Sequence, residues 1–97
     1  MRMIARRTLR EFWELHRDAE QPLRAWYAEV ATAVWDTPQT VKERYRHASF
    51  VADNRVVFNI GGNKYRLIAH VNYGHGIVFV KFVGTHSEYD CIQPETV

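Results

Sequence analysis

Residues 55–86 read RVVFNIGGNKYRLIAHVNYGHGIVFVKFVGTH, and this stretch decides the fold class. Three runs rich in Val, Ile, Phe and Tyr alternate in polarity with a period of two, which is typical of β-strands. The runs cover 55–60, 64–73 and 77 to about 86. Gly61-Gly62-Asn63 and Gly74-His75-Gly76 separate them, and these residue types accept the positive φ of short reversals. The stretch therefore predicts a three-stranded antiparallel meander.

Two amphipathic helices are predicted before the meander. Thr8 and Glu11 have the spacing of a capping box and predict a helix over about 8–18, with one apolar face formed by Leu9, Phe12, Trp13 and His16. Pro22 is predicted to be the first residue of a second helix, whose apolar side carries Leu23, Trp26, Tyr27, Val30 and Val34. Residues 1–5 are a candidate fourth strand. The predicted fold is α+β, with an N-terminal strand and a helical hairpin packed on an antiparallel β-meander.

The segment between the second helix and the meander gives weaker signals. Thr37-Pro38 predicts one short helical turn, because proline is favoured directly after a helix cap. The periodicity then fades, and residues 44–53 are predicted to form a loop.

Length and composition set limits on the class of protein. The chain has 97 residues, of which 46% are hydrophobic and 25% charged, as expected for one globular domain spanning 1–97. Its longest apolar run, 77–80, is far shorter than the roughly 18 residues of a membrane span. Cys91 is the only cysteine, so no intramolecular disulfide can form, and a lone thiol suits a reducing compartment. We therefore expect a cytoplasmic protein without a membrane segment.

The second strand of the meander separates polar from apolar side chains. One face carries Lys64, Arg66, Ile68, His70 and Asn72, whereas Tyr65, Leu67, Ala69, Val71 and Tyr73 share the predicted core face. Lys42, Arg44, Arg46 and Arg55 bring the number of basic residues between positions 42 and 66 to six. A phosphate-binding surface is one interpretation of this pattern, and a solvated charged face is the other.

The sequence after the last strand concentrates groups that can carry chemistry. Residues 85–90 read THSEYD, and such groups are often presented at the end of a strand. His86 and Tyr89 are the best candidates for proton transfer, although they could also satisfy the sheet edge while Glu88 and Asp90 face water. His86, Glu88 and Asp90 would point together from an extended strand and offer metal ligands. Three donors on one strand are an insufficient cage, so we predict no metal and no cofactor.

Two spaced motifs resemble a known family. NIGGNKYRLIA at 59–69 and GTHSEYD at 84–90 resemble the HigB family of type II toxins, within the RelE/ParE superfamily, and the segments 7–13 and 25–27 look similar too. The resemblance covers essentially the whole chain and implies a RelE-like fold. It also implies a ribosome-dependent mRNA interferase, an endoribonuclease that inhibits translation. The implied partners are a HigA-like antitoxin with a helix-turn-helix domain, the ribosome and mRNA, with DNA contacted only through the antitoxin.

The resemblance and the residue chemistry together suggest a metal-independent reaction. Cleavage by the 2′-hydroxyl needs a positioned phosphate, two proton-transfer groups and positive charge. We predict that Arg66 holds the scissile phosphate and that His86 and Tyr89 transfer protons, with the roles of acid and base left open. Lys81 completes the predicted catalytic set. The predicted phosphate contacts come from Lys64, Arg55, Arg44 and Arg46.

Two other functions remain open at this point. A ParE-like toxin would share the fold and poison DNA gyrase without cleaving RNA, because fold alone does not determine function. A metal-dependent nuclease would use His86, Glu88 and Asp90. Ribosomal RNA contacts, where they exist, are expected from the 42–66 region and from Arg6, Arg7 and Arg10.

Overall fold

The computed structural model describes residues 1–4 and 6–97. Within them the chain forms the elements β1 (Arg2–Ile4), α1 (Arg6–Leu15), the 3₁₀ turn η1 (Arg17–Ala19), α2 (Glu20–Thr32), α3 (Pro38–Arg44), β2 (Ser49–Val51), β3 (Arg55–Ile60), β4 (Tyr65–Asn72), β5 (Ile77–Thr85) and α4 (His86–Tyr89). The strands form one five-stranded sheet in the order β1-β5-β4-β3-β2. No helix among these residues is long and apolar enough to cross a membrane.

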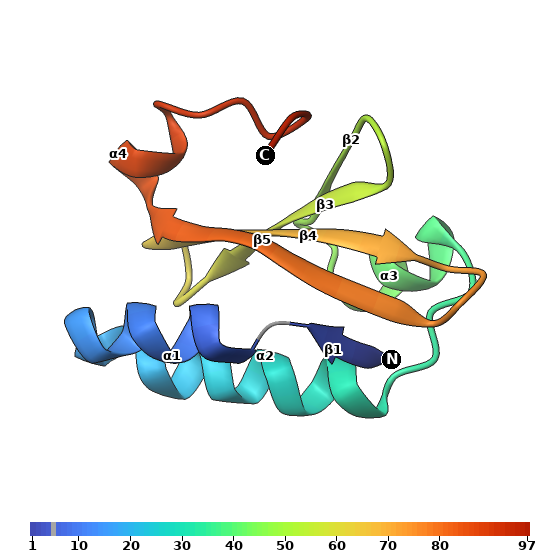
Figure 1. The fold of residues 1–97 in the computed structure, drawn as a ribbon, viewed down its shortest axis with the longest axis horizontal. Coiled ribbons are helices and arrows are strands. Elements are labelled where there is room, and N and C mark those ends of the chain that lie inside the picture. Colours follow the sequence, from blue (N-terminus) through green and yellow to red (C-terminus); the bar gives the residue numbers. More distant parts are fainter. Residues whose placement is uncertain (5) are drawn as a thin grey trace.

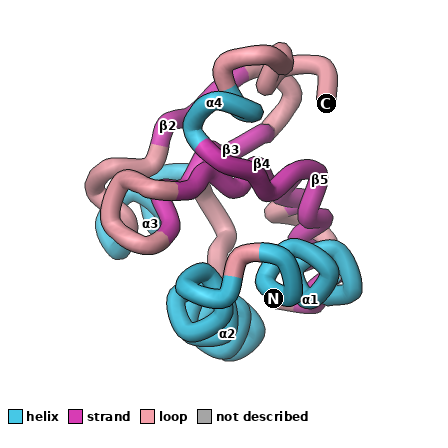
Figure 2. Tube along the Cα trace, turned by 90° about the vertical axis from the view of Figure 1, so that its left-hand side faces the viewer, coloured by secondary structure: helices cyan, strands magenta, loops and turns pink. Residues whose placement is uncertain are grey.

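The arrangement is the predicted α+β architecture. Helices α1 and α2 lie against one face of the sheet, and α4 with the C-terminal segment lies over the other (Figures 1 and 2). Strands β3, β4 and β5 pair antiparallel in sequence order, so the predicted meander is confirmed. The N-terminal strand is confirmed for Arg2–Ile4, which pairs in parallel with β5, while Ala5 of the predicted strand lies outside the described residues.

The main core lies between the helices and the sheet. Phe58 of β3 is 1% exposed and packs edge-on against the rings of Trp26 and Tyr45, at centroid distances of 5.3 and 5.0 Å. The predicted apolar positions Leu9, Trp13, Leu23, Trp26 and Val30 are all buried in this cluster. Burying one such side chain contributes about 1.5 to 3 kcal/mol, so this layer fixes the sheet on which the other face is built.

The helix boundaries differ from the predicted ones. Helix α1 begins at Arg6, before Thr8, so Thr8 and Glu11 do not form its cap; Glu11 instead accepts a hydrogen bond from Arg7 Nε at 3.1 Å. Helix α2 begins at Glu20, and Pro22 lies inside its first turn, where a missing N–H has no helical acceptor to lose. Val34 is 80% exposed because α2 ends at Thr32, before this residue.

Residues 37–53 contain more regular structure than predicted. The Thr37 hydroxyl caps α3 as expected, accepting a hydrogen bond from the Thr40 N–H at 3.3 Å, but the helix continues to Arg44 instead of ending after one turn. Part of the predicted loop forms β2, which pairs with Arg55–Val57 of β3. A three-residue strand is too short to show a period, and its turn depends on Asp53 and Asn54 at φ of 60° and 59°.

The face away from α1 and α2 is not uniformly polar. Ile68, predicted on the polar face, is 0% exposed, and it pairs across the strands with Val57 and Phe82. The C-terminal segment runs over this face (Figure 1), where Arg55 donates from Nε and Nη2 to the carbonyl oxygen of Val97 at 3.0 and 2.9 Å. The sheet therefore has a second, smaller apolar layer under the C-terminal segment.

A polar contact ties the helical layer to the meander. The Asp18 carboxylate of η1 accepts hydrogen bonds from Lys64 Nζ and from the hydroxyl of Tyr65, whose side chain is buried. The hydrogen bond from Lys64, reinforced by the one from Tyr65, lowers the pKa of Asp18 below 3.8, and the hydrogen bond to Asp18 raises the pKa of Lys64. The ionised carboxylate is thus the form that the fold favours.

We predict that Asp18→Asn lowers the melting temperature by a few degrees at pH 7, because the neutral amide loses the charge-assisted bond to Lys64. A depressed carboxyl pKa stabilises the fold above the unfolded-state pKa, and this contribution is lost as the pH falls below about 4. Thermal unfolding of both proteins between pH 7 and pH 3 tests this. A difference between them that does not shrink at low pH would contradict the assignment.

Candidate functional site

The THSEYD segment, residues 85–90, forms a helical turn. The metal hypothesis required an extended strand, in which His86, Glu88 and Asp90 would point to the same side. The N–H of Glu88 donates to Thr85 Oγ1 at 3.1 Å, and the N–H of Thr85 donates to Glu88 Oε1 at 2.8 Å. This capping box begins α4 directly after β5. His86, Glu88 and Asp90 therefore do not project from one strand, and the described residues contain no group of three His, Cys, Asp or Glu side chains arranged as metal ligands.

Gly84 allows α4 to fold back onto the sheet. It pairs across the strands with Arg66 of β4. A Cβ at this position would lie 2.5 Å from Cζ of Phe82 and 3.1 Å from Oε1 of Glu88, both closer than carbon contacts normally allow. The missing side chain leaves room for the Phe82 ring and the capping carboxylate beside Arg66.

Arg66 projects toward α4 on the face away from α1 and α2. Its guanidinium carbon lies 5.9 Å from the centre of the Tyr89 ring. Nη1 donates to the carbonyl oxygens of Asn63 and Tyr65 at 3.1 and 3.3 Å. Within the described part of the chain, neither Nε nor Nη2 has a hydrogen-bond partner, and no carboxylate pairs with Arg66. One edge of the guanidinium is therefore available to an anion.

His86 and Tyr89 share one side of α4. Residues three and four apart on a helix are neighbours, which places His86 next to both Tyr89 and Asp90. Nδ1 of His86 lies 3.3 Å from Oδ2 of Asp90. When Nδ1 carries the hydrogen and donates it to Asp90, the lone pair of Nε2 is left to accept a proton. The structure thus places Tyr89 beside Arg66, and it holds His86 against Asp90 on the same short helix.

Lys81 lies away from this group. β5 has an irregularity in which Ile68 pairs with Phe82 and Ala69 with Val80, so Lys81 is the extra residue of a bulge. Its Nζ lies 5.7 Å from the centre of the Phe79 ring. Phe79 pairs across the strands with His70, whereas Arg66 pairs with Gly84 farther along β5.

The basic residues predicted to bind phosphate do not form one surface. Lys64 pairs with Asp18, and Arg44 pairs with Glu29 at 2.5 Å. Glu29 also accepts a hydrogen bond from the Tyr45 hydroxyl. Burial, together with this hydrogen bond, raises the pKa of Tyr45. Arg55 holds the Val97 carbonyl oxygen. Of the predicted phosphate contacts, Arg46 alone has no ion pair among the residues that the structure describes.

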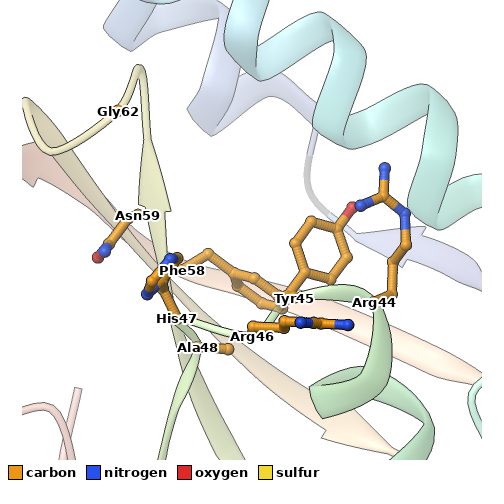
Figure 3. Close-up of a pocket in the computed structure, with 8 residues that line it drawn as sticks. All are labelled: Arg44, Tyr45, Arg46, His47, Ala48, Phe58, Asn59 and Gly62. Atoms are coloured by element: carbon orange, nitrogen blue, oxygen red, sulfur yellow. The ribbon is translucent and has the colours of Figure 1, made fainter.

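Arg46 borders a pocket that the sequence pattern did not indicate. The pocket has a volume of about 260 Å³ and lies between the segment 44–48 and β3 (Figure 3); it is lined by Arg44, Tyr45, Arg46, His47, Ala48, Phe58, Asn59 and Gly62. A hollow of about 430 Å³ adjoins it, shares His47, Asn59 and Gly62, and reaches Asn63. The available sequence signal was Asn59, a polar residue between the apolar Phe58 and Ile60, which the sheet register pairs with Arg66.

The fold is that of a RelE-like toxin: a helical hairpin covers one face of the sheet, and on the other face an arginine of β4 lies beside a tyrosine of α4. Residues 19–92 match the HigB_toxin family, described as the RelE-like toxic component of a toxin-antitoxin system. The chain belongs to this HigB toxin family, as its two motifs predicted.

Curated relatives agree with the family. The mRNA interferase HigB of Escherichia coli O6:H1 (strain CFT073) is 30% identical over 70 residues, which cover 70% of this chain and 68% of that protein. The mRNA interferase toxin HigB of E. coli K12 and the mRNA interferase HigB of Shigella flexneri are each 27% identical over 92 residues, covering 93% of this chain and 88% of theirs.

We predict that Gly84→Ala destabilises the protein by about 1 to 3 kcal/mol, because the new methyl group must displace Phe82 or the Glu88 cap. Denaturant unfolding measures this change. Gly74→Ala is the matched control, since a Cβ there would meet only Asn72 Oδ1 at 3.8 Å. Equal stability of the two variants would contradict the packing role of Gly84.

Proposed function

We propose that this chain is a ribosome-dependent mRNA interferase, an endoribonuclease that cleaves mRNA during translation and is neutralised by a HigA-like helix-turn-helix antitoxin. The family and the names of its relatives support the class of enzyme. The observation that carries the proposal is the free guanidinium edge of Arg66. The guanidinium lies beside Tyr89 of α4, and the same short helix holds the His86–Asp90 pair. The protein would then act in the cytoplasm, where ribosomes and mRNA are found.

Arg66 is the phosphate-binding group of the proposed mechanism. Nε and Nη2 form a planar fork that matches two phosphate oxygens. The hydrogen bonds from Nη1 to two backbone carbonyls fix the fork before substrate binds, so little reorganisation is needed as negative charge develops. Removing one preorganised donor of this kind typically costs about 10² to 10³ in rate.

His86 and Tyr89 are the proton-transfer pair of the proposed mechanism. Nε2 of His86 takes the proton of the 2′-hydroxyl, whose oxygen then forms a bond to phosphorus. The bond from phosphorus to the 5′-oxygen breaks, and the Tyr89 hydroxyl gives a proton to that leaving oxygen. The products are a 2′,3′-cyclic phosphate and a 5′-hydroxyl end, and Asp90 stabilises the imidazolium formed.

The other basic residues have supporting roles in this proposal. Arg46 has no ion pair among the described residues and lines a pocket that shares His47, Asn59 and Gly62 with the hollow beside Asn63, so it is available for a phosphate contact. Lys64, Arg44 and Arg55 are held by internal partners, and each would bind RNA only when a phosphate replaces that partner. Lys81 lies on β5, away from Arg66 of β4, and would contact RNA farther from the cleaved bond. Arg6, Arg7 and Arg10 line a separate hollow of about 220 Å³ and are candidates for ribosomal RNA contacts.

We expect Arg66→Ala and His86→Ala each to reduce the rate of mRNA cleavage by about 10² or more. Both side chains are outside the main core, so the variants should fold and still bind antitoxin. Mapping mRNA ends after brief induction measures the cleavage, and Arg17→Ala, an exposed arginine away from the site, is the control. Intact mRNA accompanied by DNA damage in cells expressing the unaltered protein would contradict the proposal and favour a ParE-like gyrase poison.

Attack by the 2′-hydroxyl gives a second expected result. An mRNA with a single 2′-deoxynucleotide on the 5′ side of the cleaved bond should resist cleavage, because its attacking oxygen is absent. The same substitution several nucleotides away should leave the cleavage rate unchanged. Primer extension on ribosome-bound transcripts distinguishes the two. Normal cleavage of the first transcript would exclude this route and favour water activated by another group, including a metal ion.

A further inference from the structure

The C-terminal segment, residues 91–97, is docked on the face of the sheet opposite α1 and α2. It continues from α4 through a turn in which the N–H groups of Cys91 and Ile92 donate to carbonyl oxygens of the helix, at 3.1 and 3.2 Å. Ile92, Pro94 and Val97 are half-buried, and the residues between them are exposed. One side of the segment therefore lies against the sheet (Figure 1).

This segment runs over an apolar row of the sheet. Val57, Ile68 and Phe82 pair across β3, β4 and β5. Val57 is 3% exposed and Ile68 is 0% exposed, although neither belongs to the core cluster beneath the helices. The row lies between that of Arg66 and that of Arg55. The segment thus crosses the sheet from the candidate site toward Arg55.

Arg55 holds the far end of the C-terminal segment. Its Nε and Nη2 both donate to the carbonyl oxygen of Val97, at 3.0 and 2.9 Å. Its Nη1 lies 3.9 Å from the carboxylate of Asp53, and its side chain is only 14% exposed. The guanidinium therefore uses the two donors of one edge to bind the segment and offers little free surface to another anion.

Helix α4 depends on anchors at both of its ends. It has four residues, none of them buried, and a single helical turn has little stability of its own. The Thr85–Glu88 capping box fixes the start of α4 to the end of β5. The end of α4 leads directly into the C-terminal segment. If the segment were released, α4 would be free to turn away from the sheet, and the Tyr89 ring would move away from Arg66.

We propose that Arg55 is a positioning residue for the cleavage reaction: by holding the C-terminal segment, it keeps α4 in the orientation that places Tyr89 beside Arg66 and His86 on the same turn. The inference rests on the proposed ribonuclease function and deepens it. The register partner of Arg55 is His70, four residues along β4 from Arg66, or about 13 Å. Arg55 therefore acts on the site through the C-terminal segment.

A direct contact with an RNA phosphate is the other role for Arg55. The two roles predict opposite effects of removing residues 95–97. Removal would free the guanidinium, so a phosphate contact would bind the substrate more tightly and lower KM. A positioning contact would instead be lost, and the chemical step would slow. The low exposure of Arg55 and the use of both Nε and Nη2 favour the positioning role.

Amide hydrogen exchange, measured by NMR, tests the position of α4 without RNA. The variants are Arg55→Ala and a chain that lacks residues 95–97 but keeps Arg55. We expect the N–H groups of residues 90–92 to exchange about ten-fold faster in both, while those of β4 and β5 remain unchanged. Glu95→Ala should exchange as the unaltered protein does, because it changes an exposed side chain of the segment and leaves the backbone in place.

Cleavage of ribosome-bound mRNA is the second measurement. We expect each variant to lower kcat about ten-fold or more with little change in KM, because Arg66 still binds the phosphate while the proton-transfer groups are displaced. The double variant should lose no more than either single variant, since both remove one contact. Arg17→Ala, which removes an exposed arginine of η1, should change neither constant. Cooperative melting above the assay temperature establishes that the variants are folded.

The outcomes separate this inference from the proposed function. Unchanged exchange at residues 90–92 in both variants would overturn the inference, whatever their activity. Faster exchange with unchanged kcat would also overturn the positioning role. A raised KM in Arg55→Ala, with a lowered KM in the shortened chain, would assign Arg55 to RNA instead. Absence of Arg66-dependent cleavage by the unaltered protein would overturn the proposed function, while the exchange rates would still decide whether Arg55 holds α4.

Discussion

The register of β4 against its two neighbours is the constraint on which the site depends. Asn59, Arg66 and Gly84 form one row across β3, β4 and β5. Alternate residues of a strand share a face, so a slip of one residue would turn Arg66 into the aromatic core and Tyr65 out of it. The row puts the guanidinium between a pocket on one side and α4 on the other. Every chemical group assigned above takes its position from this register.

The helical layer maintains that register from the opposite face. Phe58 of β3 and Tyr65 of β4 are both buried against residues from the helices, and the Tyr65 hydroxyl donates a hydrogen bond to Asp18. The turn between them places Gly61 and Gly62 at φ of 63° and 70°, which glycine adopts without steric cost. The core thus fixes the register of the sheet, in which alternate residues point to opposite faces. The side chains proposed to act on RNA remain on the exposed face.

The parts of the fold that the sequence predicted are those that local chemistry determines. The meander follows from alternating β-branched residues separated by glycines, and the same alternation correctly separated Arg66 from Tyr65. Helix α4 was not predicted, because six polar residues show no period; its Thr85–Glu88 capping box uses the same spacing that was wrongly assigned to Thr8 and Glu11. Lys64 and its partner Asp18 lie 46 residues apart, a pairing that sequence spacing does not reveal.

The charge around Arg66 depends on the partners that the nearby carboxylates bind. Glu88 accepts the Thr85 N–H and Asp90 lies against His86, so neither nearby acid neutralises Arg66. Elsewhere Asp18 and Glu29 neutralise Lys64 and Arg44. An anionic substrate therefore meets one preorganised guanidinium and the pocket rim instead of a broad positive field. Such a surface gives little nonspecific affinity for RNA, since that affinity grows with the number of phosphates contacted. In the proposed function the ribosome supplies the binding, and this protein supplies the position of one phosphate and its proton transfers.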